Sequence, residues 1–286
     1  MAVLHRIPRI AVRICVPALS SLLLFALASP AGAVRPFVTD DARIIDRGQV
    51  EIENWLESTR GDGQWDPAPG FNAIVGSSVT DWFEILAGGG VGADRVGGST
   101  LGNPMVMGKI LLRPSQVNGR PGVAFSASTV LDHGHGSMYL PGRVSVLLGM
   151  STWRLLDDHL HVHVNLGMRN DRGLGFDPRR RAQWGVGIEA HTPFEKTRFV
   201  GEVFSGDPLV LHAPSYAMQT GVRRVQSDYL QFDLVLGLEP ALDDQLRRRS
   251  SLELSVQLGV RVLFDVFTRG GRPGDPDGAR GFFGNR

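Results

Sequence analysis

The sequence predicts an all-β protein, a single antiparallel up-and-down transmembrane β-barrel of about twelve strands. Three observations lead to this prediction. Apolar and polar residues alternate along many segments, which is the period of a strand with one apolar face. Several of these segments reach the nine to eleven residues, approximately, that a tilted strand needs to cross a bilayer. A stretch with the features of an export signal precedes them all.

Residues 1–33 are predicted to be a secretory signal peptide. They carry three arginines and no acidic residue, an apolar stretch follows over residues 16–28, and the small residues Ala31 and Ala33 suit a signal peptidase. The alternative is an N-terminal membrane anchor, which the shortness of the apolar stretch disfavours. We therefore expect export to the outer membrane, with cleavage near Ala33.

The composition of the exported chain excludes several classes of function. Cys15, the only cysteine, lies in the predicted signal, so disulfides and thiol chemistry are not expected. Cleavage removes three arginines from the 30 basic residues and none of the 29 acidic ones, which leaves a small negative balance. A chain without a basic surface is a poor nucleic-acid partner. No stretch outside the signal is apolar enough for a transmembrane helix.

Residues 49–267 are predicted to form the barrel. The last segment, residues 252–267, has the clearest alternation: Leu254 and Leu258 share one face, while Glu253 and Arg261 share the other. A soluble β-sandwich also alternates, with its apolar face turned inward, but strand length, the export signal and the even strand count favour the membrane barrel. The expected strands are 49–60, 70–78, 82–91, 105–113, 122–131, 143–153, 160–169, 182–191, 198–205, 216–225, 229–239 and 252–267.

Two segments flank the predicted barrel. Residues 34–48, between the predicted signal and the predicted barrel, are expected to be an N-terminal periplasmic segment. Residues 268–286 are rich in glycine, arginine, proline and aspartate, a composition typical of a disordered tail.

The polar faces of the predicted strands are charged, and they are expected to line the lumen. Arginine or lysine facing lipid at mid-membrane costs about 2–4 kcal/mol, so the charged phase must point inward. The lining is either a water-filled pathway or a set of opposite charges that pair and close a narrow barrel, and we expect a closed or tightly gated lumen. The candidate lumen residues are Glu51, Glu53, Glu84, Lys109, His161, His163, Arg169, Glu189, Glu202, Arg223, Asp233, Glu253 and Arg261.

Alternate histidines raise the question of a metal. His159, His161 and His163 share one phase, about 7 Å apart, and alternate histidines on a strand can chelate zinc or copper. The alternative is a polar lumen rim beside Asp157 and Asp158, which we favour because no second motif has metal-ligand spacing. No metal and no cofactor is therefore predicted.

An enzyme is not predicted. The sequence has no Gly-x-Ser-x-Gly motif and no Ser-His-acid set with recognisable spacing. Two basic runs, at residues 179–181 and 247–249, are either contacts for lipopolysaccharide phosphates or, in the reading that we favour, solvated turns.

Several short motifs resemble one known family. Residues 36–41 (Pro-Phe-Val-Thr-Asp-Asp) and 46–53 (Asp-Arg-Gly-Gln-Val-Glu-Ile-Glu) resemble the start of the outer-membrane β-barrel family named for the meta pathway of phenol degradation. Similar stretches continue along the chain: residues 78–84, residues 101–104 with Gly108 and Lys109, residues 165–167, Gly201 with Glu202, Gly237 and Gly259.

This resemblance implies a barrel of transporter-like character. We expect a channel or transporter for small solutes, and only the resemblance implies that these are hydrophobic or aromatic. The alternative is a non-conducting structural or interaction barrel with a plugged lumen. The expected partners are outer-membrane lipid and lipopolysaccharide, the barrel assembly machinery, and a small-molecule solute that the sequence does not identify.

Overall fold

The computed structural model describes residues 37–61, 64–65, 70–93, 98–173, 176–209, 216–242 and 248–266. Among these residues the chain is all-β and no helix is present, so none is long and apolar enough to cross a membrane. The predicted signal peptide (1–33) and the predicted tail (268–286) lie outside the described residues.

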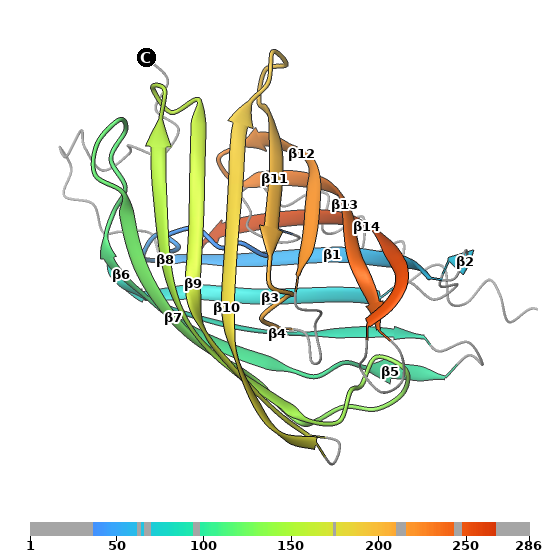
Figure 1. Cartoon of the computed structure of the whole chain (residues 1–286). Coiled ribbons are helices and arrows are strands. Elements are labelled where there is room, and N and C mark those ends of the chain that lie inside the picture. Colours follow the sequence, from blue (N-terminus) through green and yellow to red (C-terminus); the bar gives the residue numbers. More distant parts are fainter. Residues whose placement is uncertain are drawn as a thin grey trace, which may run out of the picture.

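Twelve long strands form one antiparallel sheet in this part of the chain, each hydrogen-bonded to the next in sequence (Figure 1). Two short strands, β2 (Gln64–Trp65) and β5 (Ser99–Leu101), extend two of the connections. The twelve are β1 (Gln49–Gly61), β3 (Gly70–Thr80), β4 (Phe83–Ala93), β6 (Met105–Arg113), β7 (Gly122–Val130), β8 (Arg143–Leu155), β9 (Leu160–Gly173), β10 (Phe176–His191), β11 (Thr197–Phe204), β12 (Ala217–Ser227), β13 (Leu230–Leu242) and β14 (Arg248–Asp265).

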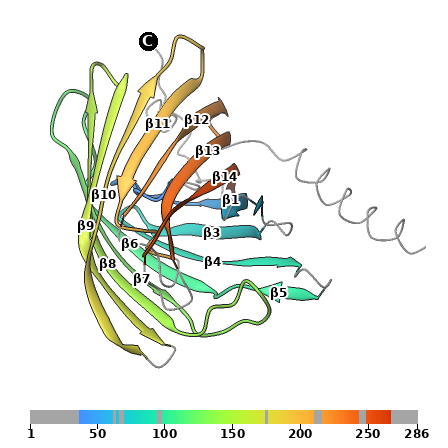
Figure 2. The same cartoon turned by 45° about the vertical axis from the view of Figure 1, so that its right-hand side comes forward.

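The first and last strands close the sheet into a barrel. β1 and β14 pair antiparallel in an unbroken register from Gln49 with Asp265 to Arg60 with Leu254. Figure 2 shows these two strands side by side, although they stand at opposite ends of the described chain. Closure gives each of the twelve long strands two neighbours, as a bilayer requires. The prediction of a closed twelve-stranded barrel is confirmed.

The two faces of the wall differ as a membrane barrel demands. Large apolar side chains point outward and remain exposed, among them Leu166 (67%) and Leu258 (54%). Charged side chains point inward and are buried, and the guanidinium-bearing Arg169 is 0% exposed. A soluble sandwich would bury the apolar face instead.

The two ends of the barrel also differ. At one end, tight turns such as residues 81–82 and 228–229 join the strands, and we call this the short-turn end. At the other end lie longer connections such as residues 131–142, and we call it the long-loop end. β1 begins at the short-turn end, so the segment before it approaches from that side.

Neither basic run is the turn that the sequence analysis favoured: Arg248 and Arg249 begin β14, while residue 247 lies outside the described residues. Residues 179–181, which the sequence analysis favoured as a solvated turn, belong to β10, which begins six residues earlier than expected. Arg179 and Arg180 are exposed there, and Arg181 Nε lies 3.3 Å from Asp171 Oδ2 on β9. At the long-loop end a strand can carry charge because its side chains meet water rather than lipid.

Candidate functional site: a lumen occupied by the N-terminal segment

The lumen wall carries the residues that the strand phases single out. Twelve of the thirteen candidate lumen residues are buried, and Glu253 is partly exposed. The buried twelve are Glu51, Glu53, Glu84, Lys109, His161, His163, Arg169, Glu189, Glu202, Arg223, Asp233 and Arg261.

One group of these residues forms an ion-pair network across four neighbouring strands. Glu189 on β10 accepts hydrogen bonds from Arg198 on β11 and from Arg223 on β12, the latter at 2.7 Å. Arg223 Nε in turn donates to Asp233 Oδ1 on β13, at 2.9 Å. Buried charges need such partners, and each of these charges has one on an adjacent strand. Arg198 was not among the predicted lumen residues, although it shares the phase of Glu202.

A second group lies across the β1–β14 seam. Arg261 on β14 donates to Glu51 on β1, and its Nε lies 3.9 Å from Glu53 Oε1. These pairs join the two strands that close the barrel, so the seam has charge pairing inside as well as backbone pairing in the wall.

The N-terminal segment occupies the lumen between these walls. Residues 37–48, here called the lumen segment, form no regular strand, yet Phe37, Val38 and Ala42 are buried. The sequence predicts a periplasmic segment at residues 34–48; the described part of it lies inside the barrel and reaches β1 at the short-turn end.

Lumen side chains hold the backbone of the lumen segment. The two oxygens of Glu202 accept the backbone N–H groups of Val38 and Thr39, at 2.7 and 2.6 Å. Asn165 and Asp40 exchange two hydrogen bonds of 2.8 Å, from the backbone N–H of Asp40 to the Asn165 amide oxygen and from the Asn165 amide to the carbonyl of Asp40. The segment thus uses side chains of β9 and β11 in place of a neighbouring strand.

The contacts continue toward the short-turn end. Thr152 Oγ1 accepts the N–H of Ala42 at 2.8 Å, and Glu84 Oε2 accepts the N–H of Ile45 at 2.7 Å. Lys109 Nζ donates to Asp40 Oδ1 at 3.0 Å. Together these bonds tie the lumen segment to β4, β6, β8, β9 and β11.

Apolar and aromatic contacts add to the polar ones. Phe37 packs with Val200 and Val235, and Val38 packs with Phe204 and Ala217. The guanidinium of Arg223 lies 5.3 Å from the centroid of the Phe37 ring, within the range of a cation–π contact.

β10 leaves space for the lumen segment. A Cβ atom at Gly185 would lie 2.7 Å from Thr39 Oγ1, and one at Gly187 would lie 3.4 Å from Thr39 Cβ. Glycine at these inward positions therefore allows the segment to approach the wall closely.

A second element enters the lumen from the long-loop end. We call residues 205–209 the inward loop. Gln183 Nε2 donates a hydrogen bond of 2.7 Å to the backbone oxygen of Gly206. Arg169 Nη1 donates one of 2.6 Å to the backbone oxygen of Asp207. Cavities of about 50 and about 60 Å³ lie beside the lumen segment, and each has room for only a few water molecules.

The histidines separate into two sets. His161 and His163 are buried in the lumen wall, and the ring of His163 lies against Thr152 Oγ1. His159 precedes β9 and its ring lies 5.0 Å from that of His191, at the short-turn end. The shared phase of the three histidines therefore does not bring them together, because His159 lies in the turn rather than in the strand.

Asp158 in that same turn is held in its ionised form. Burial by itself would raise the pKa of Asp158, but hydrogen bonds from Arg154 and His161, and their positive charge, outweigh burial and hold the pKa well below its ordinary value. Arg154 makes a two-pronged contact with the carboxylate, at 2.5 Å on each oxygen.

Three solved structures are similar to this chain, and the first of them agrees with it in fold. An outer membrane channel from Pseudomonas putida F1 is similar, with a TM-score of 0.52, 11% identity, and coverage of 81% of this chain and 100% of that chain. The NanC porin has a TM-score of 0.49 with 11% identity over 74% of this chain and 98% of that one. The KdgM porin, in complex with disordered oligogalacturonate, has a TM-score of 0.48 with 9% identity over 75% and 99%.

Sequence comparison identifies one family. The model described as "Uncharacterised conserved protein UCP029691" matches residues 21–245. No curated protein matches the chain. These matches support the outer-membrane barrel fold that the resemblance to the phenol-pathway family implies. They do not support assigning the chain to that family by name.

Proposed function

We propose a gated outer-membrane channel for small solutes as the function of this chain, which belongs to the family described as uncharacterised conserved protein UCP029691. In the state described above the channel is closed, with the lumen segment as its gate. Outer-membrane barrels carry short turns on the periplasmic side, so the lumen segment enters from the periplasm in this proposal.

The observation that carries the proposal is the way in which the lumen segment is held. Over residues 37–45 its backbone bonds to side chains such as Glu202 and Asn165, whereas the strands of the barrel bond to one another through their backbones. This part of the segment can therefore leave the lumen without breaking the barrel wall. A plug that is part of the wall would not have this freedom.

A separate argument concerns the class of solute. The resemblance to the phenol-pathway family supports hydrophobic or aromatic solutes. The similar structure from Pseudomonas putida F1 is that of an outer membrane channel. The rival function is a non-conducting barrel that interacts with partners and whose lumen segment never leaves. The charged network around Glu189, which requires no solute for its pairing, favours this rival.

Planar-bilayer conductance of the purified mature protein separates the two functions. Glu202→Ala removes a carboxylate that accepts two N–H groups, and hydrogen bonds to charged groups contribute about 1.5–3 kcal/mol each. We expect open events to become at least about tenfold more frequent in this variant, since about 1.4 kcal/mol is a factor of ten. Deletion of residues 37–45 should give a persistently open channel.

The control is Gln257→Ala, which alters an inward side chain bonded to Glu57 rather than to the lumen segment. Its conductance should equal that of the wild type. Heat-modifiable migration on gels shows whether the deletion variant folds. If it folds and still conducts no current, the channel function is excluded and the non-conducting barrel is the remaining function. Uptake of phenol against a sugar of similar size into liposomes then tests the solute class.

A further inference from the structure

We propose that His161, His163 and Glu189 form a binding site for one divalent transition-metal cation of the zinc class on the lumen wall. This inference does not depend on the channel function, because it concerns three side chains of the barrel wall. The sequence favoured a polar rim without metal at these histidines, and it did not connect them with Glu189.

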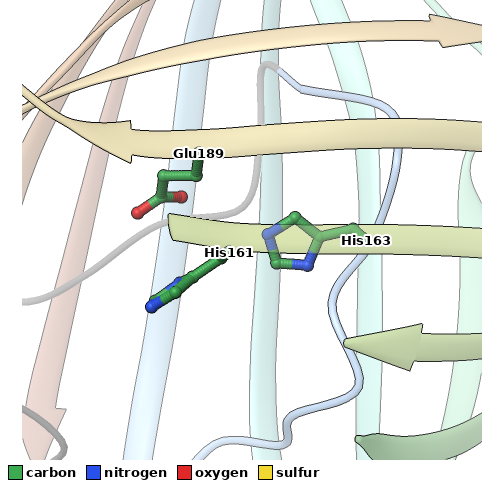
Figure 3. A group of neighbouring side chains, drawn as sticks. All are labelled: His161, His163 and Glu189. Atoms are coloured by element: carbon green, nitrogen blue, oxygen red, sulfur yellow. The ribbon is translucent and has the colours of Figure 1, made fainter. Parts of the chain in front are cut away.

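The strand register brings the three side chains together. His161 and His163 are alternate residues of β9, and on β10 the residue opposite His161 is Glu189. One ligand atom from each side chain lies within 4.8 Å of the others, and Figure 3 shows the two rings and the carboxylate grouped beside one another. Two imidazoles and one carboxylate, with one position left open, are a known zinc ligand set.

Outer hydrogen bonds orient both rings. His161 Nε2 lies 2.7 Å from Asp158 Oδ1, and His163 Nδ1 lies 3.0 Å from Thr152 Oγ1. These contacts leave His161 Nδ1 and His163 Nε2 for a cation. Metal-bound histidines characteristically bond through their other nitrogen to a carboxylate or another acceptor, which sets the ring orientation.

Glu189 keeps the capacity to bind a cation. Its two oxygens accept hydrogen bonds from the guanidinium groups of Arg198 and Arg223. An ionised carboxylate has about four acceptor positions, so these two bonds leave room for a cation. The charges around the cavity also balance, with five carboxylates and five guanidinium groups: Asp41, Asp158, Glu189, Glu202, Asp233, Arg43, Arg154, Arg198, Arg223 and Arg261. A cation therefore does not enter a site of net positive charge.

The site has access and space. All three side chains line the cavity of about 60 Å³ beside the lumen segment, which can hold a cation with a water in the open position. Asp41 of the lumen segment lines the same cavity, and its Oδ1 accepts no hydrogen bond and lies 3.7 Å from Lys109 Nζ. A carboxylate of the lumen segment thus lines the cavity that would hold the open position.

Isothermal titration with ZnCl₂ tests the site in the untagged mature protein, folded in detergent micelles. The mature chain has no cysteine to compete for zinc if the signal is removed. We expect one zinc per chain for the wild type. The double variant His161→Gln/His163→Gln should lose this binding, and Asp158→Asn should weaken it by about 10–100-fold, the usual effect of an outer partner.

The matched control is His159→Gln/His191→Gln, which removes the exposed histidine pair at the short-turn end. This variant should bind one zinc as the wild type does. The proposal is overturned if the wild type binds no zinc, if the lumen double variant binds as well as the wild type, or if the control variant alone loses binding. Heat-modifiable migration of each variant shows that the barrel is folded, and conductance is not used, so failure here leaves the channel proposal untouched.

Discussion

Glu202 illustrates what a single buried carboxylate does in this barrel. Its two oxygens accept two backbone N–H groups of the lumen segment, so it acts as a short substitute for a neighbouring strand. Charge-assisted hydrogen bonds of this kind are short and about twice as strong as neutral ones. The two N–H groups of the segment offset part of the cost of burying this charge, so the closed state and the ionised side chain stabilise one another.

Asp158 gives a prediction at the same scale. Its pKa is below the ordinary value of 3.8 because the hydrogen bonds from Arg154 and His161 outweigh burial. A lowered pKa means that the ionised group stabilises the folded barrel above about pH 4, and that this stabilisation is lost as the pH falls through the folded pKa. Asp158→Asn should therefore destabilise the barrel by about 1 kcal/mol at pH 7.

Thermal unfolding of both proteins between pH 8 and pH 3 measures this effect. The difference in midpoint between wild type and Asp158→Asn should stay constant from pH 8 to about pH 5 and narrow below about pH 4. A difference that is largest at pH 3 would contradict the lowered pKa of Asp158.

At the scale of the element, the two faces of each strand lie in different surroundings. The outward phase meets lipid and the inward phase meets buried charge, and since side chains alternate, a slip by one residue would exchange the two faces along the whole strand. β14 is the clearest case: Leu258 is outward and exposed, while Gln257 next to it is buried and donates to Glu57 Oε1.

A pair of arginine variants on β14 tests this phase. Leu258→Arg places a charge in lipid and should cost about 2–4 kcal/mol of folding free energy. Gln257→Arg places the same charge one residue away in the lumen beside Glu57, and should cost far less. Urea-dependent folding into lipid vesicles, followed by heat-modifiable migration, measures both. Equal destabilisation by the two variants would show that the faces of β14 are assigned wrongly.

At the scale of the whole molecule, closure between β1 and β14 makes every other contact possible. The register sets Asn54 opposite Val260, more than two hundred positions later in the chain. A disulfide requires Cβ atoms about 3.5–4.5 Å apart. Directly opposed residues of paired strands come close to this distance, whereas diagonal neighbours lie about 7–8 Å apart.

A cysteine pair tests the closed seam. Asn54→Cys/Val260→Cys should cross-link under mild oxidation in the folded protein, whereas Asn54→Cys/Val262→Cys, shifted by one diagonal step on the same face, should not. Gel mobility before and after reduction reads out the bond. Cross-linking of the second pair alone would mean that the seam has a different register.

The sequence by itself determined the strands and the direction of their faces. All twelve predicted strands correspond to observed strands, because lipid and lumen impose a period of two that is visible in each segment separately. The longest difference is at the start of β10, where residues 176–181 continue the strand beyond the predicted start. No lipid constraint acts there, so the alternation that marks a membrane-spanning strand is not required.

Only the tertiary structure decided which of these inward residues meet. Glu189 joins His161 and His163 through the register of β9 and β10, and Glu202 meets Val38 across 164 residues of sequence. The lumen segment has no periodicity that could have revealed its place, since it is held by side chains of several strands rather than by a ladder. Its Thr-Asp motif at residues 39–41 marked a family resemblance without indicating a contact. Local patterns record the surroundings of each strand, whereas the contacts inside a closed lumen depend on the closure of the entire barrel.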